Sequence, residues 1–180
     1  NRKSGKTTRI TTNESSLSVD WIEVDGKKYL FGIENNPAQT KVSIIDPLNG
    51  VVIASENYQV TLGIKTTIDN KAYLGAGATD IPFQLWVMTF DGTNLTKEIV
   101  VDLPQEKKEK MIASTTERVT IPTFDIDPKT GETRQLHAYI LTPENPLPEG
   151  KEIVMIQSFY GGGNYYDIEH QIFNEAGMYV

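Results

Sequence analysis

The feature that most constrains this fold is a series of short strand patterns separated by turn signals. Between residues 17 and 102, apolar runs alternate with such signals, and the first turn is Asp25-Gly26, between Trp21–Val24 and Lys28–Ile33. An Asp-Gly pair between apolar runs favours a hairpin, because both central residues of a type I′ turn need a positive φ. This part of the chain is therefore expected to form sheets of short strands.

The order of strands and turns then repeats. Tyr29 and Tyr73 are 44 residues apart, and Asp46 and Asp91 are 45 residues apart. A four-stranded unit of about 40–50 residues is the period of a β-propeller blade. The repeat predicts about two blades, and a sandwich of evenly spaced strands is the alternative. Two blades cannot close a propeller, so we expect further blades upstream of residue 1.

Composition excludes several classes of protein. The 180 residues are 38% hydrophobic and 23% charged, which is typical of a soluble globular protein. No stretch approaches the roughly 20 apolar residues of a membrane span, so we expect no membrane partner. A net charge of −7 argues against nucleic acid as a partner. The absence of cysteine excludes disulfides and thiolate chemistry within this stretch. The compartment, whether cytoplasmic, periplasmic or secreted, stays open.

A charged stretch, Leu103–Lys110, separates two kinds of pattern. It begins with Leu-Pro and is typical of a linker. Beyond it, Glu117–Ile126 and Leu136–Leu141 predict two longer strands. We therefore expect two parts, with residues 1–110 as a partial β-propeller and residues 111–180 as the start of a second domain.

The end of the chain predicts a βαβ unit. Ile153–Ile156 is a continuous apolar run, which is typical of a strand buried on both faces. Asn164 or Asp167 can cap a helix that ends before Gly177. Met178–Val180 then begins another strand. Because the pattern stops inside that strand, we expect the domain to continue beyond residue 180.

A glycine turn, Gly161-Gly162-Gly163, follows the apolar strand. It lacks the Gly-x-Gly-x-x-Gly spacing of a dinucleotide loop, and we predict no cofactor. Two interpretations stay open. The turn is either a simple tight connection or a loop whose backbone and neighbouring donors stabilise an oxyanion.

The residues from Leu136 to Pro143, followed after a loop by those from Ile153 to Gly162, resemble the start of the catalytic domain in the prolyl oligopeptidase family of serine peptidases. That family places a β-propeller before an α/β-hydrolase domain. The resemblance implies a fold of propeller blades followed by the N-terminal part of an α/β-hydrolase domain. It covers most of the chain as architecture, but only about residues 117–180 as motif.

The resemblance also implies a function and a site. The chain would belong to a serine-type peptidase that hydrolyses peptide bonds through an acyl-enzyme, without a metal or cofactor. Tyr160 would donate its hydroxyl to the oxyanion, and Gly161 and Gly162 would form the rest of the oxyanion loop. The expected partners are a peptide substrate and the remainder of the same polypeptide.

The catalytic triad is expected elsewhere. The sequence has no Gly-x-Ser-x-Gly motif, and in α/β-hydrolases the nucleophile precedes the acid and the histidine. All three would therefore follow Val180, and these 180 residues alone are expected to be inactive. His137 is expected to be structural, and His170 to pack or lie at the surface. The alternatives are an acyl-peptide hydrolase or esterase of similar architecture, and a non-catalytic propeller module that binds a partner.

Overall fold

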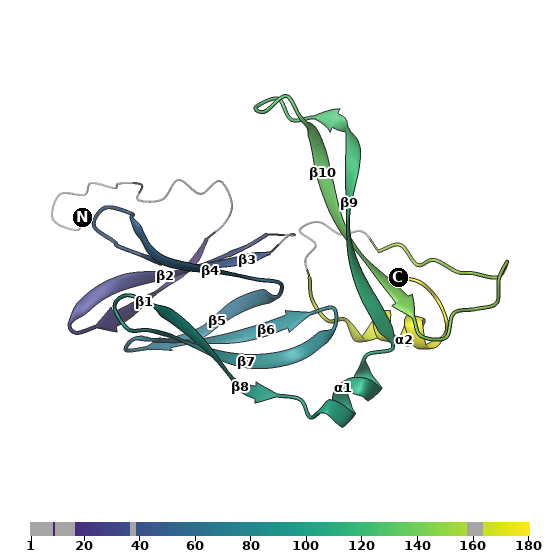
Figure 1. The fold of residues 1–180 in the computed structure, drawn as a ribbon, viewed down its shortest axis with the longest axis horizontal. Coiled ribbons are helices and arrows are strands. Elements are labelled where there is room, and N and C mark those ends of the chain that lie inside the picture. The colour runs from purple at the N-terminus through teal and green to yellow at the C-terminus, as the bar shows by residue number, and fades with distance from the viewer. Residues whose placement is uncertain (1–8, 10–16, 37–38, 158–163) are drawn as a thin grey trace. The chain divides into compact units, whose positions relative to one another are not determined.

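A computed structural model of the chain describes residues 9, 17–36, 39–157 and 164–180 (Figure 1). The chain divides into two compact units. The first comprises residues 1–76 and 84–102, and the second comprises residues 77–83 and 103–180. The predicted division after residue 110 falls inside a short helix of the second unit.

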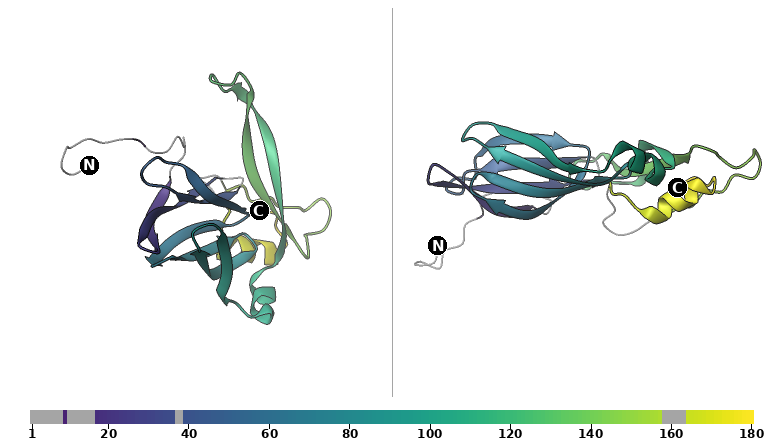
Figure 2. Two further views of the ribbon diagram at one scale, coloured as in Figure 1. Left: turned by 60° about the vertical axis from the view of Figure 1, so that its left-hand side comes forward. Right: turned by 90° about the horizontal axis from the view of Figure 1, so that it is seen from below.

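Two four-stranded sheets, each built from consecutive strands, make up the first part of the chain (Figures 1 and 2). The strand orders are β1-β2-β3-β4 and β5-β6-β7-β8. The strands are β1 (Ser18–Val24), β2 (Lys27–Asn35), β3 (Thr40–Ile45), β4 (Val52–Tyr58), β5 (Thr61–Ile68), β6 (Lys71–Ala78), β7 (Ile81–Phe90) and β8 (Leu95–Asp102). The predicted all-β architecture is confirmed, and the described residues do not form a closed propeller.

The first hairpin turn of each sheet has the same backbone conformation. Asp25 has a φ of 49° and Asp69 has a φ of 52°, and both occupy the turn between the first two strands of their sheet. Aspartate tolerates this left-handed conformation better than most residues. The predicted turn at Asp25 is thus confirmed.

The last hairpin turn of each sheet depends on an aspartate side chain. The Asp46 carboxylate accepts a hydrogen bond from the Leu48 amide at 2.8 Å. The Asp91 carboxylate accepts the equivalent bond from the Thr93 amide, also at 2.8 Å. These are Asx turns, in which the side chain takes the place of a backbone carbonyl. The spacing of the two aspartates therefore reflects a shared turn structure.

The core of the first unit lies between its two sheets. Tyr29 of β2 and Phe90 of β7 meet edge to face, with ring centroids 5.2 Å apart. Buried and less buried residues alternate along β6, as expected of a strand with one covered face, whereas β2 is buried continuously from Tyr29 to Ile33. Burying each large apolar side chain contributes about 1.5–3 kcal/mol. The largest fully buried apolar side chains are those of Phe31, Ile33, Val42, Ile44, Leu74, Met88 and Phe90.

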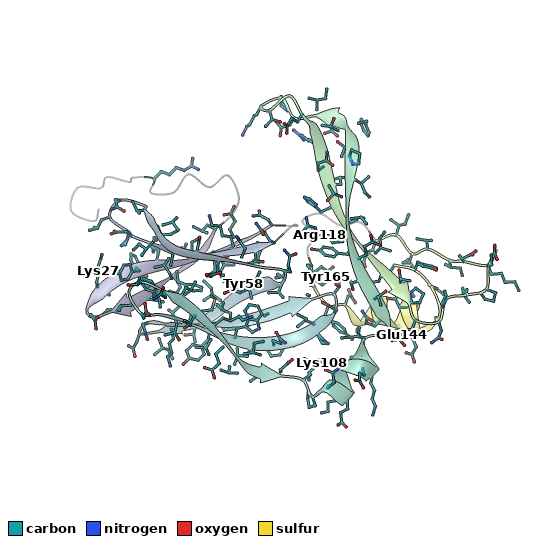
Figure 3. All side chains as sticks on the ribbon, in the orientation of Figure 1. Lys27, Tyr58, Lys108, Arg118, Glu144 and Tyr165 are labelled. Carbon is teal, nitrogen blue, oxygen red and sulfur yellow. The ribbon has the colours of Figure 1, made fainter. Side chains whose placement is uncertain are left out.

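An aromatic pair extends this packing towards solvent. The rings of Tyr58, labelled in Figure 3, and Trp86 lie 5.2 Å apart at an interplanar angle of 73°. The Lys97 ammonium lies over both, 4.3 Å from the Trp86 centroid and 5.4 Å from the Tyr58 centroid. Burial raises the pKa of the Tyr58 phenol, and the Glu56 carboxylate raises it further. Trp86 thus serves the packing of the first unit.

A side-chain amide joins the end of β2 to the start of β5. Asn35 Nδ2 donates to the Leu62 carbonyl at 2.9 Å, and its Oδ1 accepts from the Leu62 amide at 3.1 Å. The Asn35 side chain therefore forms with the Leu62 backbone the same pair of hydrogen bonds that the N–H and C=O groups of a neighbouring strand would form. The buried Thr40 hydroxyl donates to the same Oδ1 at 2.6 Å and orients the amide.

The main part of the second unit, from residue 103 onward, contains helix α1 (Gln105–Met111) and then a long hairpin of β9 (Ser114–Ile126) and β10 (Thr133–Pro143). Helix α2 (Ile168–Glu175) follows. Both predicted strands are confirmed, and the predicted linker forms α1. Among the described residues, no helix is long and apolar enough to cross a membrane.

One face of the β9–β10 hairpin is apolar. Ile121 pairs with Leu136, Val119 pairs with Ala138, and Ile140 lies on the same face two residues further along. Ile121 and Leu136 are 49% and 59% exposed. The hairpin thus carries an apolar face that the described residues leave open to solvent.

We expect the Asp91 carboxylate to contribute stability that is lost in acid. Backbone hydrogen bonds from Asn94 and Thr93 lower the pKa of Asp91. A carboxyl whose pKa is lower in the folded state stabilises the fold above its unfolded pKa, and this contribution disappears as the pH falls through the folded pKa. Urea unfolding should therefore show Asp91→Ala to be less stable than the parent at about pH 7, with a smaller difference at about pH 3.

The matched control is Asp91→Asn, which keeps an oxygen acceptor but does not titrate. Its stability relative to Asp91→Ala should change little over the same pH range. An equal loss on Asp91→Ala at both pH values would contradict the role given to the ionised carboxylate.

Candidate functional site

The predicted oxyanion-loop residues Tyr160, Gly161 and Gly162 lie outside the residues that the structure describes, as does Gly163. The structure does describe both flanks of this loop. Gln157 precedes it and Asn164 follows it. These flanking residues connect the loop to residues 153–157 on one side and to helix α2 on the other.

The segment before the loop pairs with the end of the chain. Val154 and Tyr179 form a parallel bridge. The Met155 amide donates to the Tyr179 carbonyl at 2.8 Å, and the Tyr179 amide donates to the Ile153 carbonyl at 2.9 Å. Helix α2 lies between these two segments in the sequence. The two segments are thus parallel and connected through α2, but they share a single isolated bridge, and neither forms one of the two strands predicted on either side of the helix.

The end of the chain also pairs with β10. Leu141 and Val180 exchange two backbone hydrogen bonds of 2.8 and 3.1 Å, the pattern of an antiparallel pair. Residues 178–180 consequently lie between β10 and residues 153–155. The order across the second unit is β9, β10, residues 178–180 and residues 153–155.

The expectation that Ile153–Ile156 is buried on both faces is wrong. Ile153 is 46% exposed, Val154 is 63% exposed and Ile156 is 84% exposed. In the described part of the chain, this segment has a backbone partner on the Tyr179 side, and these three side chains stay largely exposed. Without covering layers, a continuous apolar run does not by itself produce burial.

Helix α2 begins and ends at residues that the sequence indicates. Asp167 is its N-cap and accepts a hydrogen bond from the Glu169 amide at 2.9 Å. Asn164, the other predicted cap, instead accepts from the Thr79 amide at 2.8 Å. Gly177 follows the helix with a φ of 83°, and a Cβ there would lie 3.0 Å from the Asn145 carbonyl oxygen. Glycine is required at this position on both counts.

The buried face of α2 is polar. Gln171 and Asn174 are 3% and 1% exposed, whereas Ile168 and Ile172 are more than half exposed. The apolar spacing of the helix therefore does not mark its buried side. Sequence reasoning missed the two amides, because their burial depends on backbone groups from distant segments.

Both amides satisfy backbone groups. Gln171 Oε1 accepts from the Ala113 amide at 2.8 Å, ahead of β9. Asn174 Nδ2 donates to the carbonyls of Leu141 and Met178 at 3.1 and 2.8 Å. Asn174 Oδ1 is buried without a hydrogen-bond partner among the described residues. These bonds connect α2 to the residue before β9, to β10 and to the segment that follows the helix.

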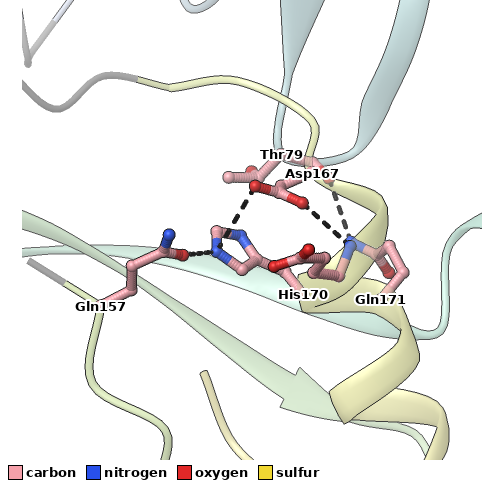
Figure 4. Close-up of polar contacts among 6 residues, drawn as sticks. Thr79, Gln157, Asp167, His170 and Gln171 are labelled. Carbon is pink, nitrogen blue, oxygen red and sulfur yellow. Dashed lines mark hydrogen bonds and ion pairs between the residues drawn. The ribbon is translucent and has the colours of Figure 1, made fainter. Parts of the chain in front are cut away.

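His170 joins the two flanks of the loop (Figure 4). Its Nε2 contacts Gln157 Oε1 on the near flank and lies 4.0 Å from Asp167 Oδ2 at the helix cap. An amide oxygen can only accept, so the Nε2 contact assigns the proton to that nitrogen. His170 Nδ1 is buried and has no hydrogen-bond partner in the described ranges. The side chain is 12% exposed, so the packing alternative predicted for His170 is confirmed.

His137 and Tyr166 both have structural contacts. His137 Nδ1 lies 3.2 Å from the Thr120 hydroxyl across the hairpin. The Tyr166 hydroxyl donates to the Met111 carbonyl at 2.8 Å. Burial raises the pKa of this phenol, and the Asp167 carboxylate raises it further, so it stays protonated as a donor. Within the described residues, no group of three or more His, Asp or Glu side chains could hold a metal ion.

No model of a known protein family matches this chain, and no curated protein is significantly similar to it in sequence. What the chain does must therefore be inferred from its own residues and their geometry.

We expect Gln171→Leu to loosen the attachment of α2. The substitution removes the acceptor of the Ala113 amide, and an unsatisfied buried donor costs about 1–3 kcal/mol. Amide hydrogen exchange at Ala113 should become faster, with a lower free energy of unfolding for the second unit. The neighbouring Glu169→Gln is the control, because Glu169 is exposed and should tolerate the change. Unchanged protection at Ala113 in Gln171→Leu would contradict the role of this amide.

Proposed function

We propose that this chain is part of a serine-type peptidase of the prolyl oligopeptidase kind, in which propeller blades precede an α/β-hydrolase domain. The main support is the connection from residues 153–155 through α2 to the parallel residues 178–180. Ligands of open α/β sheets bind beyond the carboxyl ends of the strands, and the segment 157–167 follows such an end. In α/β-hydrolases, one oxyanion donor comes from a strand-to-helix loop of this type.

The first unit supports the propeller half of this proposal. Each of its sheets consists of four consecutive strands, which is the organisation of a propeller blade. The shared turn chemistry of Asp46 and Asp91 indicates that the two sheets repeat one structural unit. A blade array in such an enzyme would restrict access to the site, which suits peptides better than folded proteins.

In the proposed reaction, a serine attacks the carbonyl carbon of the substrate and forms a tetrahedral intermediate. Tyr160 donates its hydroxyl to the developing oxyanion. Gly161 and Gly162 lack side chains and let the backbone approach the substrate closely. Collapse of the intermediate expels the amine and leaves an acyl-enzyme, which water then hydrolyses. The serine and its partners belong to residues outside these 180, because this sequence has no Gly-x-Ser-x-Gly motif.

The flanks of the loop support a preorganised site. Asp167 caps α2 and His170 joins the helix to Gln157, so both ends of the loop are anchored to the same helix. Electrostatic stabilisation of an oxyanion needs donors that are already in place when charge develops.

We expect Tyr160→Phe to reduce kcat in a polypeptide that carries this chain together with the nucleophile. Loss of one oxyanion donor costs about 10²–10³ in kcat, or roughly 2.7–4 kcal/mol. KM should change much less, because the donor acts mainly in the transition state. Hydrolysis of a fluorogenic peptide with proline before the scissile bond measures both constants.

Two controls accompany this experiment. Tyr73→Phe, in β6 of the first unit, removes a phenol hydroxyl from a sheet and should leave kcat unchanged. The 180-residue chain alone should neither turn over the peptide nor react with a fluorophosphonate probe. An unchanged kcat in Tyr160→Phe would reject the oxyanion role. Probe labelling of the short chain would reject the placement of the nucleophile.

A further inference from the structure

A groove in the second unit runs between its two helices. Its walls come from α1, α2 and the loop that follows β10. The lining residues include Met111, Ile112, Glu144, Ile168, Ile172 and Glu175. We propose that this groove binds an amphipathic peptide segment that carries lysine or arginine beside its apolar residues. The proposal is independent of the hydrolase assignment.

The apolar part of the groove is a pair of isoleucines one helical turn apart. Ile168 and Ile172 are 53% and 56% exposed, and their i and i+4 positions place them side by side on α2. Met111 and Ile112, at the end of α1, line the same groove and are half-buried. Such a cluster suits the apolar face of a helix that inserts anchors at i, i+3 or i+4.

The charged part of the groove is mainly acidic. Glu109, Glu144 and Glu175 line it and are all exposed, against the single cation Lys110. Glu144, labelled in Figure 3, lies in the loop after β10, so the carboxylates come from three separate segments. Acidic groups around an apolar centre favour a basic partner and disfavour an acidic one. Charge complementarity therefore favours a segment with a net positive charge.

The floor of the groove is fixed before binding. Gln171 and Asn174 line it from below and are bonded to the backbone at Ala113, Leu141 and Met178. A preformed site avoids much of the ordering cost of association. Ile168 and Ile172 therefore lie on a helix that is held in position by hydrogen bonds within the second unit.

Fluorescence anisotropy with two labelled peptides tests this proposal. The first is a helical peptide of about 14 residues with leucine at i, i+3, i+4 and i+7 and lysine on its flanks. The second has glutamate in place of lysine. The lysine peptide should bind the chain, more weakly as salt rises, and the glutamate peptide should not. Ile168→Ser with Ile172→Ser, and separately Glu144→Lys with Glu175→Lys, should each weaken binding about tenfold or more.

Matched substitutions outside the groove provide the controls. Ile68→Ser removes an isoleucine that is 54% exposed on β5, and Glu132→Lys reverses an exposed charge in the turn between β9 and β10. Both should leave binding unchanged, and circular dichroism should show that all variants fold. Equal binding of both peptides, or groove variants that bind like the parent, would overturn the proposal. Self-association that the Ile168 and Ile172 substitutions abolish would overturn it in favour of a second copy of this chain.

Discussion

The amide side chains of Gln171 and Asn174 fasten helix α2 to the backbone of the second unit, and both proposed sites depend on that attachment. Gln171 is hydrogen-bonded to Ala113, just ahead of β9, while Asn174 is hydrogen-bonded to Leu141 of β10 and to Met178 after the helix. Tyr160 lies a few residues before this helix in the sequence. The same helix carries Ile168 and Ile172 into the groove. Because the polar side of α2 is buried, its isoleucines remain exposed and can contact another segment.

Turn chemistry and helix caps could be predicted because they depend on neighbouring residues. The aspartates at 25, 46, 69 and 91 adopt turn roles that aspartate favours wherever the chain reverses. Asp167 and Gly177 likewise mark the ends of α2 through local hydrogen bonding and φ. The repeat in the first hundred residues could be found from these landmarks alone, and its two four-stranded sheets are present.

Burial in the second unit could not be predicted, because it depends on segments far apart in the sequence. The apolar run Ile153–Ile156 predicts a strand covered on both faces, but its neighbours in the described chain contact it along one edge. Ile168 and Ile172 have the helical spacing that is typical of a buried face, but they are more than half exposed, and the buried Gln171 instead accepts a hydrogen bond from the Ala113 amide, 58 residues away. Tyr160 to Gly162 lie outside the described residues, so their role rests on the family resemblance and on the geometry of their flanks.

The most direct test of the proposed function is a crystal structure of a polypeptide that carries this chain and a Gly-x-Ser-x-Gly serine, trapped with a peptidyl trifluoromethyl ketone. The serine adds to the ketone carbon and produces an oxyanion that imitates the tetrahedral intermediate. The Tyr160 hydroxyl oxygen should lie about 2.7–3.1 Å from that oxyanion. A hydroxyl turned away from the oxyanion, with another group donating in its place, would contradict the assignment of Tyr160.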